Sequence, residues 1–217
     1  MRTAYEQQLA ELTDRLGELA GLAGRALALA TRALFEADLA AAERALDLEE
    51  QIKSVEVECS ERTVAFLALQ SPVAGDLRHV FTAVRISADL ARMGGLALHI
   101  AQSARRRNPG RAIPETGACA DLQTMADLAA QMSAAVTEAV TAPTLETITV
   151  IHRTDVRLDE LHARVMAALD DPAWPHGVTA AVDVSLIARF LERFGDQAVD
   201  VADRMYFFVT GERPPAS

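Results

Sequence analysis

Apolar residues recur with the 3.6-residue period of an amphipathic helix along nearly the whole chain, a pattern typical of helices that bury one face. No run of residues alternates between apolar and polar, and no Asn-Gly or Asp-Gly pair gives a hairpin signal. The eight prolines lie between the periodic segments, where a residue that costs about 3 kcal/mol inside a helix is tolerated. The pattern therefore predicts an all-α protein.

The pattern predicts six long helices, over residues 3–37, 38–69, 71–107, 117–141, 143–169 and 177–209. Asp38 is placed to cap the second helix, and Ser71-Pro72 to open the third, because Asp and Ser accept hydrogen bonds from free N–H groups and proline suits the first turn. Long helices joined by short turns pack as antiparallel bundles. We therefore expect two three-helix bundles, over residues 1–107 and 116–212.

Arg105, Arg106 and Arg107 end the third predicted helix, directly before Asn108-Pro109-Gly110. Basic side chains in a last turn complement the negative end of the helix dipole. A basic docking patch is the second interpretation, and the sequence leaves both open.

The two halves of the chain are related in sequence, because residues 86–101 align with residues 187–202 at a constant offset of 101. Identical pairs under this offset are Ile86 and Ile187, Leu90 and Leu191, Arg92 and Arg193, Gly94 and Gly195, Ala97 and Ala198, and Ala101 and Ala202. A glycine inside a helix costs about 1 kcal/mol relative to alanine. Its recurrence at one position predicts a close helix approach in both copies of an internal duplication.

The composition is that of a folded, acidic protein, with 50% hydrophobic residues and a net charge of −10. This charge argues against a general nucleic-acid binder, whose surface is basic. Cys59 and Cys119 show no metal-ligand spacing and cannot form a disulfide framework, which favours a reducing compartment. The N-terminus is a mixed-charge helix, and Arg25, Arg32 and Glu36 interrupt the most apolar early stretch. We expect a cytoplasmic protein without a membrane span.

A ladder of acids marks the last predicted helix, where Glu192, Asp196 and Asp200 follow one another at four-residue spacing. Like charges at this spacing destabilise a helix by about 0.2–0.5 kcal/mol per pair. Solvent, a bound cation or neighbouring arginines must offset that repulsion. The arginines at suitable spacing are Arg189, Arg193 and Arg204.

The preceding helix carries a second acidic ridge, with Asp155 and Asp159 one turn apart and His152 and His162 three residues outside them. Two acidic ridges on sequential antiparallel helices indicate a site for a hard or borderline cation. A solvated, salt-bridged face is the alternative interpretation. The first repeat lacks the ladder, because Ala91, Gly95 and His99 occupy its positions.

Enzyme motifs are absent: the chain has no P-loop, no G-x-S-x-G, no H-E-x-x-H and no E-x-x-H. The missing E-x-x-H argues against a ferritin-like oxidase. A carboxylate-bridged metal hydrolase or oxidase built on the two acidic ridges remains the alternative to a non-enzymatic protein. Trp174, in a proline-bounded loop, is interpreted as an anchor for that loop.

Two segments, LQSPVAGDLRHVFTAVRISADLARMGGLALHIA and SLIARFLERFGDQAVDVADRMYFFVTGE, resemble the signature helices of the PhoU family. The spacing of Q-x-P-V-A-G-D-L-R followed by L-x-R-x-G carries the resemblance, which spans Tyr5 to Glu212. ARRRNPG and WPHGVTAAVDVSL look like actinobacterial members.

The resemblance implies a cytoplasmic homodimer, peripheral to the membrane only through its partners. It implies a negative regulator of phosphate uptake and of phosphate-starvation signalling, without catalysis of its own. The implied partners are subunits of the phosphate ABC transporter and a sensor histidine kinase.

The family's E-x-x-x-D motif, which can bind multinuclear metal clusters, matches Glu192 and Asp196, with Asp200 where asparagine is usual. Asp155 and Asp159 resemble the acids that face the motif. The resemblance thus implies Fe, Zn, Mg or Mn in the C-terminal bundle only.

Overall fold

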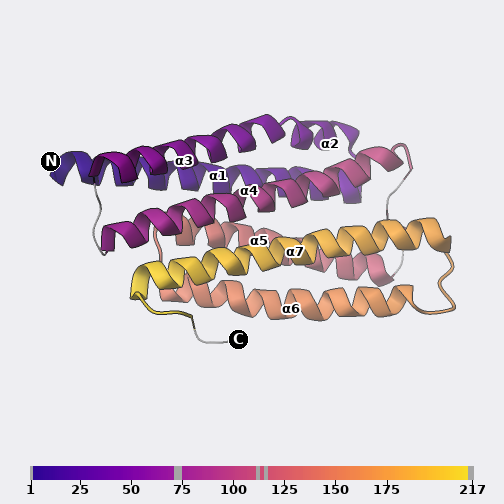
Figure 1. Ribbon diagram of the computed structural model, residues 1–217. Helices are drawn as coiled ribbons and strands as arrows, with labels where there is room; N and C mark the ends of the chain where they lie inside the picture. The colour runs from indigo at the N-terminus through magenta and orange to yellow at the C-terminus, as the bar shows by residue number, and fades with distance from the viewer. Residues whose placement is uncertain (1, 71–74, 111–112, 115–116, 215–217) are drawn as a thin grey trace.

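The computed structural model describes residues 2–70, 75–110, 113–114 and 117–214, which contain seven helices and no strand (Figure 1). The helices are α1 (Arg2–Glu36), α2 (Leu39–Leu46), α3 (Glu49–Gln70), α4 (Gly75–Arg107), α5 (Gly117–Thr141), α6 (Leu145–Leu169) and α7 (Gly177–Thr210). The predicted all-α class is confirmed. In this part of the chain no helix combines the length and apolarity needed to cross a bilayer.

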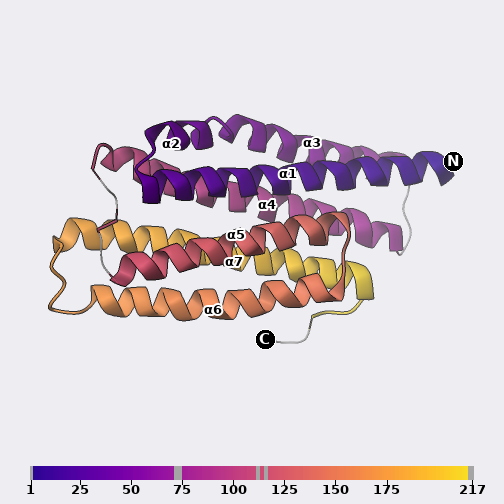
Figure 2. The same cartoon turned by 180° about the vertical axis from the view of Figure 1, so that it is seen from behind.

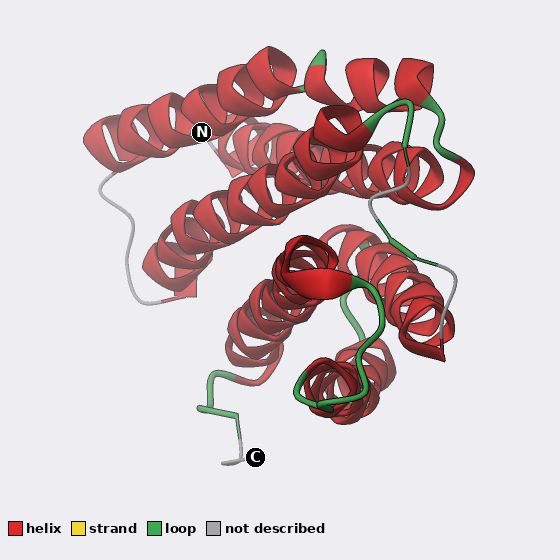
Figure 3. Cartoon of the chain, turned by 90° about the vertical axis from the view of Figure 1, so that its right-hand side faces the viewer, coloured by secondary structure: helices red, strands yellow, loops and turns green. Residues whose placement is uncertain are grey.

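The helices form two antiparallel bundles that lie one above the other along their whole length (Figures 1 and 2). The upper bundle holds α1 to α4 and the lower bundle holds α5 to α7, as the end-on view in Figure 3 shows. α1 and α4 of the first bundle pack on α5 and α7 of the second. One continuous apolar core therefore runs through both bundles.

The second predicted helix, over residues 38–69, is wrong in one respect, because the chain breaks it into α2 and α3 at Asp47 and Leu48. Asp38 caps α2 as predicted, accepting a hydrogen bond from the N–H of Ala41 at 2.9 Å. The break leaves few backbone groups unpaired, since the N–H groups of Asp47 and Leu48 still bond to earlier carbonyls. Aspartate is a weak helix former, and no proline or glycine announces the break. The predicted start of the third helix, Ser71-Pro72, lies outside the described residues.

The two glycines of the internal repeat have the same role in both bundles. A Cβ atom on Gly94 would lie 2.8 Å from Cδ1 of Ile52 on α3, and one on Gly195 would lie 2.5 Å from Cδ2 of Leu158 on α6. Gly94 therefore lets α3 approach α4 closely, and Gly195 lets α6 approach α7 closely. The predicted close approach is confirmed in both copies.

The C-terminal arginines of α4 join the two bundles. Arg106 and Arg107 contact the carboxylate of Asp183 on α7 at 3.0 and 2.5 Å, and that side chain is only 4% exposed. Arg105 pairs with Glu43 of α2 at 3.6 Å. Arg106 and Arg107 thus serve an internal contact that neither sequence interpretation included.

We predict that Gly195→Ala lowers the free energy of unfolding by about 1–3 kcal/mol, because the new methyl group meets the buried Leu158 and overpacking costs this much. The control is Gly95→Ala on α4, where a Cβ atom meets nothing within 4 Å. Helix propensity should make that variant more stable by about 0.5–1 kcal/mol. Urea denaturation measures both, and equal effects of the two substitutions would contradict the packing role of Gly195.

Candidate functional site

The structure brings the two predicted acidic ridges together on one face of the second bundle. Glu192, Asp196 and Asp200 lie on α7, and Asp155 and Asp159 lie on α6. The close approach at Gly195 sets the geometry, because a Cβ atom there would lie 2.9 Å from Oδ1 of Asp155. The Asp155 carboxylate therefore rests against the backbone of α7 at Gly195, which directly precedes Asp196 and lies one turn from Glu192.

Burial and like charge make this face electrostatically costly. Burial, followed by the negative charges of Asp159, Asp196 and Glu192, raises the pKa of Asp155 to about 7. The pKa of Glu192 is also raised, first by burial and then by the charge of Asp196. A half-buried carboxylate with a neutral-range pKa surrounded by acids is a frequent feature of functional sites.

Only some of the ion pairs that we expect between arginines and the ladder acids are formed. Arg189 pairs with Glu192, whereas Arg193 makes no ion pair with Asp196 within the described part of the chain. Arg204 lies 3.9 Å from Asp200 but bonds mainly to Asp89 of α4, at 2.5 Å. The interpretation of the ladder as a fully salt-bridged face therefore holds at Glu192 and is weak at the other two acids.

Three buried polar atoms in this region have no hydrogen-bond partner: Oδ1 of Asp155, Oε2 of Glu192 and Nε2 of His162. Buried polar groups in native proteins are almost always hydrogen-bonded. Carboxylate oxygens and an imidazole nitrogen are donors that Mg²⁺, Mn²⁺, Zn²⁺ and Fe accept. The chemistry of this donor set fits a divalent or trivalent cation.

The side chains do not converge as a ready-made coordination shell, since no group of three His, Cys, Asp or Glu residues close enough to hold a metal occurs among the described residues. His152, the other histidine of the ridge, instead lies 3.1 Å from Oδ1 of Asp203. In the first bundle His99 stacks on Phe190, with ring centroids 5.2 Å apart. His99, which occupies the position equivalent to Asp200 in the first repeat, thus contributes to the contact between the bundles.

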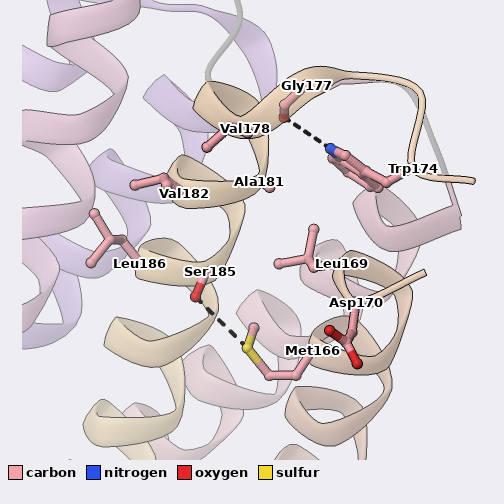
Figure 4. Close-up of a pocket in the computed structure, with 10 residues that line it drawn as sticks. All are labelled: Met166, Leu169, Asp170, Trp174, Gly177, Val178, Ala181, Val182, Ser185 and Leu186. Atoms are coloured by element: carbon pink, nitrogen blue, oxygen red, sulfur yellow. Dashed lines mark hydrogen bonds between the residues drawn. The ribbon is translucent and has the colours of Figure 1, made fainter. Parts of the chain in front are cut away.

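A second feature of the C-terminal bundle, which sequence reasoning missed, is an open pocket of about 570 Å³ where α6 and α7 meet their connecting loop (Figure 4). Met166, Leu169 and Trp174 line it together with an exposed apolar stripe on α7. The stripe consists of Val178, Val182 and Leu186. Its four-residue spacing was a readable signal, because apolar residues on two faces of a helix indicate two contacts.

The loop beside this pocket is anchored as predicted. Nε1 of Trp174 donates a hydrogen bond to the carbonyl of Gly177 at 3.0 Å, drawn as a dashed line in Figure 4. The indole thereby fixes the loop to the first turn of α7.

Fold and site define an all-α class of protein in which two related helical bundles are packed together and the second carries two facing acidic ridges. The PhoU domain matches the chain twice, over residues 16–104 and 122–205. The chain belongs to the PhoU family. The two matches fall in the two bundles and reproduce the internal duplication.

The chain aligns with named relatives over nearly its full length. The phosphate-specific transport system accessory protein PhoU homolog 2 of Mycobacterium tuberculosis is 46% identical over 99% of this chain and 100% of its own. The PhoU homolog 1 of Mycobacterium leprae is 44% identical over 99% of this chain and 96% of its own. The predicted likeness to actinobacterial members is confirmed.

The crystal structure of PhoU from Pseudomonas aeruginosa shares the fold, with a TM-score of 0.88 at 22% identity over 96% of this chain and 100% of its own.

We predict that Asp155→Asn stabilises the metal-free protein at about pH 8 by about 1–3 kcal/mol and changes little near pH 4. The pKa of Asp155 is raised on folding, so the native state binds the proton more tightly than the unfolded state. Stability therefore falls as pH rises from about 4 to about 7, and asparagine removes that loss.

Urea denaturation of chelator-treated protein across this range measures the effect. Glu160→Gln, on an exposed residue of the same helix, is the control and should leave the pH profile unchanged. A profile of Asp155→Asn identical to that of the parent protein would contradict the burial of an ionised carboxylate.

Proposed function

We propose that this protein is a negative regulator of phosphate uptake and of phosphate-starvation signalling. It acts without catalysis, through contacts with subunits of the phosphate ABC transporter and with a sensor histidine kinase, and it works as a homodimer. The observation that carries the proposal is the relation to named accessory proteins of phosphate-specific transport, at 46% identity over 99% of the chain.

The apolar stripe on α7 is the surface that we assign to the transporter. Val178, Val182 and Leu186 are all exposed beside the 570 Å³ pocket. Exposed apolar side chains gathered around a concave surface are typical of protein contacts. The acidic residues Asp170 and Asp171 at the edge of the loop favour a partner whose apolar segment is flanked by basic residues.

The acidic face is the second part of the proposal, as a metal site that ties α6 to α7. Asp155, Glu192 and His162 would contribute the atoms that have no hydrogen-bond partner, and Asp196, Asp159 and Asp200 would complete the acidic surroundings. A cation bound there supplies positive charge to a region where burial and repulsion raise carboxyl pKa values. Carboxylate-rich surroundings favour Mg or Mn, and the histidine admits Zn or Fe.

We predict that deletion of the gene in phosphate-replete medium switches on phosphate-starvation genes, and that the intact gene silences them again. Val182→Asp should complement poorly and should recover less transporter in a pull-down, because a buried, unpaired charge opposes an apolar contact. Reporter expression and the recovered transporter subunits are the measurements.

The matched control is Val156→Asp on α6, since Val156 is 59% exposed, Val182 is 50% exposed and only Val182 lines the pocket. Full activity of both variants would contradict the assigned surface but not the regulatory function. Starvation genes that stay silent in the deletion strain would overturn the function itself.

For the metal site, we predict that Mn²⁺ or Zn²⁺ raises the Tm of chelator-treated protein by about 5–11 °C at about 100 times its Kd. Glu192→Gln and Asp196→Asn should abolish this shift, because each removes a negative oxygen donor. Thermal unfolding and metal analysis of the purified protein measure it. An undiminished shift in both variants would place the metal elsewhere.

A further inference from the structure

A smaller cavity, of about 250 Å³, lies between the N-terminal part of α4 and the C-terminal part of α7. It is separate from the acidic ladder and from the stripe at the other end of α7. Its main lining residues are Phe81, Thr82, Arg85, Arg204, Phe207 and Arg213. The cavity thus combines aromatic walls with arginines from both bundles, in a protein whose net charge is −10.

Each acid near this cavity lies within 4 Å of a histidine or arginine nitrogen, although Oδ1 of Asp203 is buried without a hydrogen bond. Asp203, which also lines it, lies 3.1 Å from Nε2 of His152. Arg204 lies 2.5 Å from Asp89. Arg85 and Arg213 form no ion pair with any described residue, although the charge of Arg85 opposes the burial that raises the pKa of Asp89. Both guanidinium groups are therefore available to bind an anion.

The hydroxyl group of Thr82 adds a directional contact. Thr82 is 4% exposed and lines the cavity, yet its hydroxyl forms no hydrogen bond within the described residues. Its oxygen is not among the buried polar atoms without a partner, so it is open to solvent at the cavity. Thr82 is therefore available to donate a hydrogen bond to an oxyanion that the arginines attract.

The aromatic walls indicate that the ligand is more than a bare anion. Phe81 is 62% exposed, although a large apolar side chain gains from being covered. Phe207 lies on the other side, with the guanidinium carbon of Arg78 5.4 Å from its ring centroid. The volume is below the roughly 300–1,000 Å³ of sites for drug-sized ligands, so a small ligand fits best.

We propose that this cavity binds a small organic phosphate monoester, with its phosphoryl group at Thr82, Arg85 and Arg213 and its apolar body against Phe81 and Phe207. A dianionic head matches two unpaired guanidinium groups, whose planar N–H pairs suit phosphate oxygens. A carboxylate carries only one charge, and inorganic phosphate leaves the aromatic walls uncovered. The inference does not rest on the regulatory function proposed above.

The test is isothermal titration calorimetry of the full chain with four probes: phenyl phosphate, inorganic phosphate, benzoate and phenol. We expect phenyl phosphate to bind most tightly. Arg85→Ala and Arg213→Ala should each weaken it about tenfold or more, the usual loss for a charge-assisted contact, and Thr82→Val several-fold. Phe81→Ala should reduce the affinity for phenyl phosphate to that for inorganic phosphate.

The control is Arg92→Ala, since Arg92 is an exposed arginine of the same helix that does not line the cavity, and it should bind phenyl phosphate like the parent protein. Thermal unfolding of each variant confirms that it is folded. The proposal is overturned if Arg92→Ala weakens binding as much as Arg85→Ala does. It is equally overturned if no probe binds, or if inorganic phosphate or benzoate binds as tightly as phenyl phosphate.

Discussion

The buried carboxylate of Asp183 fixes how the two bundles sit on each other. An ionised carboxylate taken out of water costs several kcal/mol unless it is paired and hydrogen-bonded, and Arg106 and Arg107 supply both oxygens with partners. Toward the other end of α7, Arg204 forms an ion pair with Asp89 in the middle of α4. An apolar seam alone is tolerant of sliding, because many registers bury similar area. Charged contacts near the two ends of α7, one with the last turn of α4 and one with the middle of α4, favour a single register.

The two copies of the repeat share one close helix contact but differ in the charged residues around it. Gly94 and Gly195 still admit the middle helix of each bundle. In the second copy this close approach presses Asp155 against α7, where Glu192 and Asp196 stand one turn apart. The same glycine that improves packing therefore concentrates negative charge in a half-buried place. In the first copy the equivalent positions hold Ala91 and Gly95, so the approach carries no such cost.

Periodicity, caps and repeats were enough to predict the helices, the duplication and the meeting of the two acidic ridges, because each depends on residues close in sequence or on adjacent helices. The break at Asp47 escaped prediction because a weak helix former is its only local signal. The contacts of Asp183 with Arg106 and Arg107 join residues more than 70 positions apart. Such contacts depend on how one bundle is rotated against the other, which helical periodicity does not encode. The cavity at Thr82 and Arg85 escaped for the same reason.

One side chain connects the acidic face to the small cavity. Arg204 lies 3.9 Å from Asp200, at the end of the ladder, and 2.5 Å from Asp89, and it also lines the cavity. Unit charges about 4 Å apart interact by about 1–4 kcal/mol between bulk water and a protein surface. A charge added at the ladder or in the cavity therefore acts on the same guanidinium group. That group also holds α4 to α7. A change of charge in the C-terminal bundle therefore also affects the packing of the two bundles on each other.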